Sequence, residues 1–215
     1  MLLPGDPGRA LMLAQALLEE PRMFNHHRGL WGYTGTASDG GTVTIQATGM
    51  GGPSAAIVLQ ELISLGARRA IRVGTCGALD PDLGLGSLVI AAEAITADGT
   101  SRALGAGERA PADGQLTAAL EAAAPRAALG SVISVDLFYD ADLGAAGDAL
   151  AVEMEAAALF ALGSRTQVAV GCVLTVTDTF DGLGGRERID DHLLQESAEA
   201  MGRAAVAALA GDGLR

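Results

Sequence analysis

The chain has 215 residues, 49% of them hydrophobic, and this length and composition exclude a disordered or fibrous protein. Its 26 acidic and 14 basic residues give a formal net charge of −12, and every basic residue is arginine. Because phosphate neutralisation requires the opposite charge, we expect binding neither to nucleic acid nor to a membrane surface. No membrane span, signal peptide or disulfide framework is indicated. We therefore predict a single cytoplasmic domain over residues 1–215.

Short apolar runs alternate with segments of helical period, and glycines stand at most of the junctions. In chain order, the predicted elements are a strand at residues 1–3, a helix at 9–18, a strand at 42–48, a helix at 54–65, strands at 70–74 and 88–95, a helix at 115–124, a strand at 129–135, a helix at 155–162, a strand at 168–177 and a helix at 189–210. Ser54 is the expected N-cap of the second helix, and Gly66 is expected to end it. Residues 103–114 and 143–149 are interpreted as surface loops. The alternation predicts an α/β fold with a central mixed sheet flanked by helices.

Ligands of open α/β sheets bind beyond the carboxyl ends of the strands, and the first such end is the turn from Gly5 to Arg9. Its backbone N–H groups and a guanidinium at a helix N-terminus suit an oxyanion. An ordinary strand-to-helix turn with a surface arginine accounts for the same residues, so the turn alone leaves both interpretations open.

The second strand end is that of the predicted strand at residues 70–74, in which Arg72 is the one charged residue of an apolar run. Thr75, Cys76 and Gly77 follow the strand. A buried guanidinium is costly unless it is paired, so Arg72 requires an anionic partner, either a protein carboxylate or a ligand. Thr75 adds a hydroxyl at the same end. We interpret Cys76 as a packing residue rather than a nucleophile, since no histidine base is apparent.

Two acids, Glu153 and Glu155, flank Met154 at the start of a nearly apolar helix. At least one carboxylate is expected to face inward, where it suits the vicinal hydroxyls of a sugar. The alternative is that both acids only complement the helix dipole.

The late apolar strand ends at Asp178, which is a candidate general acid or a cap of the following turn. The segment from Gly49 to Gly51 resembles a dinucleotide fingerprint, but Ser54 replaces its last glycine, and we discount it.

Seven segments in this order match a single family. They are Leu3-Pro4-Gly5-Asp6-Pro7-Gly8-Arg9, Asn25-His26-His27-Arg28-Gly29, Gly49-Met50-Gly51-Gly52-Pro53-Ser54, Arg72-Val73-Gly74-Thr75-Cys76-Gly77, Ser134-Val135-Asp136-Leu137-Phe138-Tyr139, Val152-Glu153-Met154-Glu155 and Thr177-Asp178. Together they resemble the nucleoside phosphorylases of the bacterial purine nucleoside phosphorylase and uridine phosphorylase type, closest to the purine-type members. The segments span almost the whole chain, and their order makes the resemblance specific.

The resemblance implies the nucleoside phosphorylase fold and phosphorolysis, in which inorganic phosphate attacks a nucleoside to give ribose 1-phosphate and a free base. No metal or organic cofactor is implied. The implied phosphate-binding residues are Gly5, Arg9, Arg72 and Thr75, together with Arg28 from a neighbouring subunit. The implied ribose-binding residues are Met50, Glu153, Met154 and Glu155. The implied base-binding residues are Cys76, Gly77, Phe138, Val152 and Asp178.

Asp178 is also the implied proton donor to N7 of a purine, assisted by a downstream arginine, for which we prefer Arg188 to Arg186. Purine specificity is implied because the stretch between Phe138 and Glu153 is too short for the insertion with which uridine-type members recognise uracil. An acid at position 178 resembles members that accept 6-amino as well as 6-oxo purines. Adenosine and inosine are therefore candidates, with a 5′-methylthio nucleoside as a third.

Because Arg28 would complete a neighbour's site, the resemblance implies a dimer as the smallest catalytic unit, and the family generally forms hexamers of three dimers. The family's N-terminal histidine, which meets the 5′ hydroxyl across that interface, precedes the first strand and is expected to be missing here.

Five alternatives to a purine-specific phosphorylase are open to the same sequence. Uridine or 5′-methylthioadenosine phosphorolysis would use the same fold. In a nucleosidase, water replaces phosphate, and the three phosphate-type arginines argue against it. A nucleoside-binding protein without catalysis is disfavoured by Asp178, Glu155 and Arg72. A dinucleotide oxidoreductase would need an acidic residue at the end of the next strand, where Arg72 and Thr75 stand instead.

Overall fold

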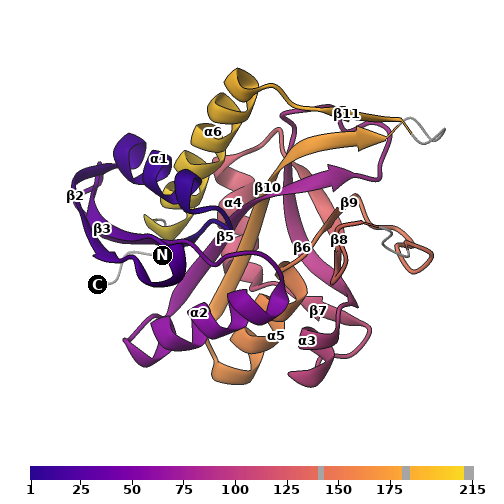
Figure 1. The fold of residues 1–215 in the computed structure, drawn as a ribbon, viewed down its shortest axis with the longest axis horizontal. Coiled ribbons are helices and arrows are strands. Elements are labelled where there is room, and N and C mark those ends of the chain that lie inside the picture. Colours follow the sequence, from indigo (N-terminus) through magenta and orange to yellow (C-terminus); the bar gives the residue numbers. More distant parts are fainter. Residues whose placement is uncertain (140–142, 181–184, 211–215) are drawn as a thin grey trace.

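A computed structural model shows one mixed β-sheet with helices on both faces, which confirms the predicted α/β fold (Figure 1). The structure describes residues 1–139, 143–180 and 185–210. The strands are β1 (Leu2–Leu3), β2 (Leu18–Asn25), β3 (Gly32–Ala37), β4 (Thr42–Gln46), β5 (Arg69–Ala78), β6 (Leu88–Ala97), β7 (Arg109–Pro111), β8 (Ala128–Val135), β9 (Ala151–Glu153), β10 (Ala169–Phe180) and β11 (Arg186–Arg188). The helices are α1 (Pro7–Leu17), α2 (Gly52–Ser64), α3 (Gly99–Ala103), α4 (Gly114–Ala123), α5 (Ala156–Thr166) and α6 (Asp191–Ala210), with a 3-10 turn at His27–Gly29.

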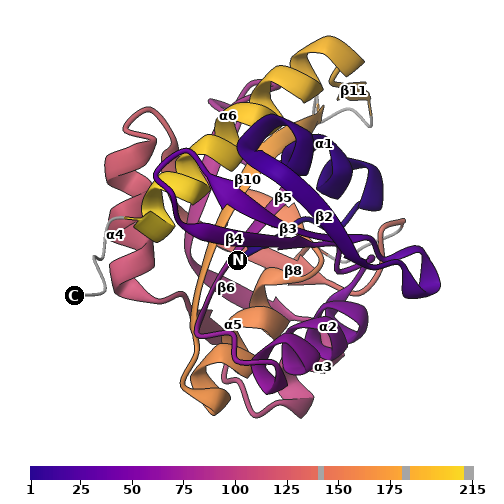
Figure 2. The same ribbon diagram turned by 90° about the vertical axis from the view of Figure 1, so that its left-hand side faces the viewer.

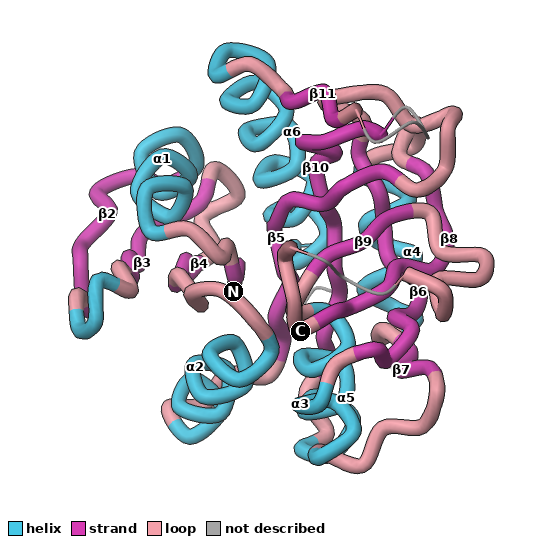
Figure 3. The backbone as a smooth tube through the Cα atoms, turned by 45° about the vertical axis from the view of Figure 1, so that its right-hand side comes forward, coloured by secondary structure: helices cyan, strands magenta, loops and turns pink. Residues whose placement is uncertain are grey.

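Five strands of the sheet form a closed circuit. The strand order is β11-β10-β6-β8-β9-β5-β1-β4-β3-β2, and β10 pairs with β5 as well as with β6. The circuit consists of β5, β9, β8, β6 and β10, each paired with the next and β10 paired back to β5. An extension of the sheet, formed by β1, β4, β3 and β2, continues from β5 (Figure 3). β5 and β10 run parallel and are buried over most of their length. Their carboxyl ends consequently lie side by side.

The outer strand of the extension is β2, and its pairing with β3 is irregular. The register shifts between Glu19 and Arg22 and again between Met23 and Asn25. Glu20 has a positive φ of 46°, and Pro21 follows it. This strand therefore offers a bent and interrupted edge.

Two groups of helices cover the two faces of the sheet. α2, α3 and α5 lie on one face, and α1, α4 and α6 on the other (Figures 1 and 2). The core on the first face includes Leu59 and Phe160, and the core on the second includes Leu13, Leu116 and Met201. The first eight residues of α5 are all buried, as expected of a helix that is apolar on every side. Within the described ranges, no helix combines the length and apolarity needed to cross a membrane.

Some predicted boundaries were wrong. α2 begins at Gly52, so Ser54 is not its N-cap, and the Ser54 hydroxyl instead donates to the carbonyl of Thr48 at 2.5 Å. Gly66 follows the helix with a φ of +105°, which confirms it as the stop signal. β5 continues beyond residue 74 to Ala78 because its pairing with β10 extends along the strand.

Several strands were missed in the sequence. The interpretation of residues 103–114 as a loop was wrong at one point, because β7 lies within them and pairs with β6. β2 carries two acids and a proline, and β3 contains two glycines, so neither has the composition of a typical strand. β9 is only three residues long, and its pairing partners β5 and β8 define it.

Candidate active site

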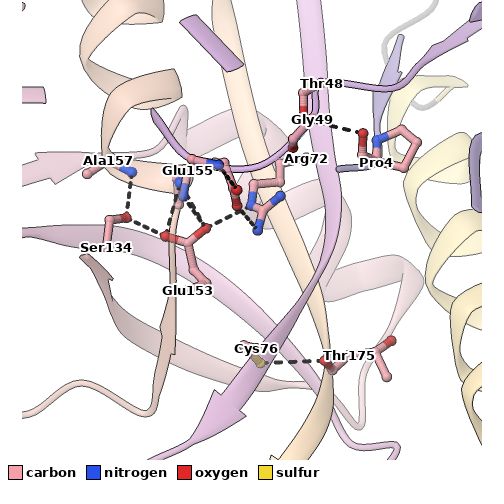
Figure 4. Close-up of polar contacts among 12 residues, drawn as sticks. Pro4, Thr48, Gly49, Arg72, Cys76, Ser134, Glu153, Glu155, Ala157 and Thr175 are labelled. Carbon is pink, nitrogen blue, oxygen red and sulfur yellow. Dashed lines mark hydrogen bonds and ion pairs between the residues drawn. The ribbon is translucent and has the colours of Figure 1, made fainter. Parts of the chain in front are cut away.

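A buried guanidinium lies at the centre of the candidate site, where Arg72 of β5 meets two carboxylates (Figure 4). Its Nε donates to Oε2 of Glu153 at 2.8 Å, and its Nη2 lies 2.5 Å from Oε2 of Glu155. All three residues are buried. The anionic partner that the sequence demands for Arg72 is therefore a pair of protein carboxylates, and both acids face inward.

Electrostatics make this cluster one cation shared by two anions. Burial by itself lowers the pKa of the Arg72 guanidinium, but the charges of Glu155 and Glu153 outweigh burial and raise it. Burial raises the pKa of the Glu153 carboxyl; Arg72 opposes this shift and the negative charge of Glu155 adds to it. Arg72 therefore stays protonated, and the cluster carries one negative charge in excess when both acids are ionised.

Local backbone geometry explains why these residues can meet. A Cβ at Gly74 would lie 2.7 Å from Cζ of Arg72, so the guanidinium crosses the strand where there is no side chain. Oε2 of Glu153 accepts the backbone N–H groups of Glu155 at 2.8 Å and Ala156 at 2.9 Å. Glu153 thus also satisfies the N-terminus of α5, as the helix-dipole interpretation expects.

The loop between β4 and α2 joins the cluster to the first turn of the chain. Gly51, which has a φ of 85°, donates its N–H to Oε1 of Glu155 at 2.6 Å. In the same loop, the N–H of Gly49 donates to the carbonyl of Gly5 at 3.0 Å. Met50 lies between these two glycines and is 87% exposed, and Met154 is half-buried. Of the implied ribose residues, Glu153 and Glu155 thus meet at Arg72, Met50 is next to Gly51, and Met154 packs against the cluster of Ile133, Val135 and Ala149.

Of the implied phosphate residues, Arg9 and Arg72 lie within range of each other's charge. Burial lowers the pKa of the Arg9 guanidinium, and the positive charge of Arg72 lowers it further. The negative charges of Asp6 and Glu155 oppose this shift. The carboxylate of Asp6 caps α1 by accepting the N–H of Arg9 at 2.7 Å. Thr75 is half-buried on β5. Arg28 is exposed in the 3-10 turn between β2 and β3, and it makes no ion pair with the carboxylates of the Arg72 cluster within the described residues.

A second group of polar residues surrounds Asp178, which is buried near the end of β10. One oxygen, Oδ2, contacts the Thr177 hydroxyl at 2.9 Å. The other, Oδ1, accepts Nε of Arg186 at 2.8 Å and lies 3.8 Å from Nε of Arg188. The sequence-based preference for Arg188 is not matched by the geometry. Arg188 is opposite Asp178 in the strand register, but its side chain is mostly exposed, whereas Arg186 makes the hydrogen bond.

The implied base-binding residues lie at the adjoining strand ends. Gly77 of β5 is paired with Val152 of β9, and Cys76 is buried. Burial raises the pKa of the Cys76 thiol, which agrees with its interpretation as a packing residue. Phe138 is about half exposed, and Cζ of Arg186 lies 5.1 Å from its ring centroid. Residues 140–142, within the stretch whose shortness suggested purine specificity, lie outside the described residues.

Phe180 is an aromatic residue at this site that the sequence analysis did not find. A Cβ at Gly77 would lie 3.0 Å from its ring and 3.3 Å from Cγ1 of Val152. The ring is 49% exposed. The sequence does place an aromatic residue two positions after Asp178. Only the pairing of β10 with β5 shows that this residue lies next to Gly77.

Comparisons with known proteins show which family the chain belongs to. The family described as the phosphorylase superfamily matches residues 1–210. The chain belongs to this superfamily. It is 39% identical over 191 residues to the DeoD-type purine nucleoside phosphorylase of Clostridium novyi, covering 83% of this chain and 82% of the relative. The DeoD-type purine nucleoside phosphorylase of Oceanobacillus iheyensis is 40% identical, with coverage of 83% and 81%. The uridine phosphorylase of Treponema pallidum is 43% identical over 197 residues, with coverage of 82% and 76%. This phosphorylase superfamily member is thus an enzyme of the type these relatives represent, as the seven segments implied.

Replacing Arg72 with methionine should lower the free energy of unfolding by about 3–5 kcal/mol near neutral pH, because Glu153 and Glu155 lose the cation they share. Without that cation, the pKa of Glu153 should rise further above its value in the unfolded chain. A carboxyl whose pKa is raised on folding binds more protons in the folded state, so stability should return as the pH falls through that pKa. Urea denaturation at a series of pH values between neutral and mildly acidic measures both effects.

The matched control is Arg126→Met, the same change at an exposed position. It should alter stability by no more than about 0.5 kcal/mol at any pH in the series. A deficit in Arg72→Met that does not shrink on acidification would show that the two carboxylates do not depend on Arg72.

Proposed function

We propose that the chain is a purine nucleoside phosphorylase, which uses inorganic phosphate to cleave the glycosidic bond of purine ribo- and deoxyribonucleosides. The observation that carries this proposal is the contact between Arg72 and Glu155, which are 2.5 Å apart at their charged ends. It joins a cation suited to phosphate with an acceptor suited to sugar hydroxyls, so the two reactants would meet there. The Clostridium and Oceanobacillus relatives are purine nucleoside phosphorylases by name, which supports the same reaction.

The phosphate subsite would be formed by Arg9, Arg72, Thr75 and the backbone of Gly5. The ion pairs of Arg72 engage Nε and Nη2, so we assign the phosphate to its Nη1 group. Positive charge from Arg9 and Arg72 binds the phosphate locally, while the acidic surface is screened by salt over about 10 Å. We assign no metal or organic cofactor to this reaction, and phosphate is a co-substrate.

In the ribose subsite, Glu155 would accept the 2′ and 3′ hydroxyls, with Met50 and Met154 against the sugar. Glu153 is assigned differently from the sequence interpretation, because protein donors already fill its carboxylate. The transition state resembles an oxocarbenium ion, and the excess negative charge of the Arg72 cluster would stabilise the positive charge that develops on the sugar. Phosphate would then attack the anomeric carbon.

The base would lie against Phe138, Phe180 and Val152, with Asp178 protonating N7 as the bond breaks. Protonation is needed because a purine leaves poorly as an anion. We assign the assisting role to Arg186 because it makes the shorter contact to Asp178. Uracil has no N7, so this acid favours purines, whereas the name of the Treponema relative keeps uridine as the alternative substrate.

We propose a dimer as the minimal catalytic unit, with Arg28 contributed across the interface and a hexamer as the expected assembly. The support is positional. Arg72 is on β5 with Arg9 within range of its charge, while Arg28 is exposed in the turn between β2 and β3, at the end of the extension from β5.

The function is tested by incubating the enzyme with adenosine, inosine, 5′-methylthioadenosine and uridine, each with and without phosphate, and separating the products by chromatography. Purine release that depends on phosphate and persists with a metal chelator is the expected result. Release without phosphate would identify a nucleosidase. Binding of nucleoside with no release from any of the four would identify a binding protein.

The Asp178→Asn variant tests the proton donor. It should lower adenosine turnover by about 10²- to 10⁴-fold, because the amide cannot deliver a proton. Turnover of a 7-methylpurine nucleoside, whose base leaves without N7 protonation, should fall much less. The control Asp191→Asn makes the same change at an exposed position and should leave both rates unchanged. Equal losses on the two substrates would refute the role.

Mixing two inactive variants tests the contribution of Arg28 across the interface. Arg28→Ala and Asp178→Asn should each be inactive alone, whereas co-refolded subunits should recover about a quarter of the wild-type sites, since one of the two sites in each mixed dimer is intact. Turnover of adenosine measures the recovery. If Arg28 acts within its own chain, mixing will restore nothing.

A further inference from the structure

We propose that Ser134 is a positioning residue of this site, which acts through Glu153 to orient Arg72 toward phosphate. The proposal rests on the proposed phosphorylase function and names a residue to which the sequence assigned no role. Ser134 lies on β8 directly beside Glu153 of β9 in the parallel register, and both residues are buried.

The direction of the hydrogen bonds around Ser134 is determined by its partners. Its Oγ accepts the backbone N–H of Ala157 at 2.9 Å, so its one hydroxyl hydrogen is available for Oε1 of Glu153, with which it forms a short contact (Figure 4). Since Ser134 has no exposed surface, water does not replace this donor. The hydroxyl therefore links the start of α5 to the carboxylate.

The two oxygens of Glu153 share one donor, the N–H of Ala156, and otherwise have different partners. Oε1 accepts the Ser134 hydroxyl and, at 3.0 Å, the N–H of Ala156. Oε2 accepts Nε of Arg72 and the N–H of Glu155, both at 2.8 Å, and the shared N–H of Ala156 at 2.9 Å. The Ser134 hydroxyl is thus the donor that Oε1 does not share with Oε2, so it sets which oxygen faces α5 and which faces the Arg72 guanidinium.

Losing the Ser134 hydroxyl should affect phosphate more than nucleoside. It would leave Oε1 with only the N–H of Ala156, which it shares with Oε2, and the N–H of Ala157 without the acceptor it has in the wild type, in a buried site. The carboxylate can then turn, and Arg72 loses the fixed partner that sets its orientation. Asp178 is held by a separate group of residues on β10 and β11, so protonation of the base should be preserved.

The test is Ser134→Ala, assayed by calorimetric phosphate binding and by steady-state kinetics in which phosphate and nucleoside are varied separately. We expect phosphate affinity to fall about tenfold, with a parallel rise in KM for phosphate and a change of less than about threefold in KM for nucleoside. In a Glu153→Gln background, Ser134→Ala should add little to the loss, because Ser134 acts through that carboxylate.

Ser131→Ala is the matched control. Ser131 lies on the same strand and also donates to a glutamate, Glu93, at 2.9 Å, but away from Arg72. Phosphate affinity should be unchanged in this variant. If Ser134→Ala does not fold, Ser134→Cys carries the test, since it retains a weaker donor of similar size and should give an intermediate affinity.

Unchanged phosphate affinity in folded Ser134→Ala, an equal loss in Ser131→Ala, or a full additional loss in the Glu153→Gln background would each overturn the proposal. The same two assays on the wild-type enzyme show whether a failure concerns Ser134 or the proposed phosphorylase function. Phosphate binding without nucleoside turnover would refute the phosphorylase and leave Ser134 to be judged by binding. Normal wild-type turnover with an unaffected Ser134→Ala would refute the role of Ser134 alone, and a wild type that binds no phosphate would refute both.

Discussion

The burial of Arg72 between two acids is the interaction on which the candidate site depends. It joins β5 to β9 and to the first turn of α5, and through Gly51 it also holds the loop between β4 and α2. Burying three charges costs several kcal/mol of desolvation per ion, which the ion pairs and the backbone donors around Glu153 offset. Such an arrangement contributes little net stability for its cost. Its value lies in holding charged groups at fixed positions before any ligand arrives.

This pre-organisation bears on how an acidic protein can act on an anion. Long-range attraction is weak, because salt screens the acidic surface, so local donors must do the binding. The shared ion pair also means that the sites for anion and sugar are not independent. A ligand that draws Arg72 toward itself weakens its hold on Glu155, and a sugar on Glu155 changes the charge that Arg72 presents. The two reactants are therefore expected to affect each other's affinity through one contact.

The sequence indicated which residues belong to the candidate site, but not most of the contacts between them. An arginine in an apolar strand, followed later by two acids before an apolar helix, was enough to require a partner for Arg72 and an inward carboxylate. The sequence could not show that both acids meet the same arginine, because this depends on the pairing of β5 with β9. Ser134 was missed for the same reason, since it and Glu153 are 19 positions apart and only the register of β8 and β9 makes them neighbours. The sequence could not decide between Arg186 and Arg188, because the choice depends on which side chain reaches Asp178 across the pairing of β10 with β11, and Arg186 makes the shorter contact.

The closed circuit of five strands has a consequence for how copies of this chain can associate. Each of the five strands has at least two partners, and β5, β6 and β10 each have three, so none of β5, β9, β8, β6 and β10 is an edge strand in the described part of the sheet that could template the addition of a foreign strand. The extension ends at β2, where Glu19, Glu20 and Pro21 interrupt the ladder. Growth of a continuous intermolecular sheet is thus blocked at both places. Contacts between copies at this edge must then be made by side chains, and such contacts can be altered one residue at a time without unravelling the sheet.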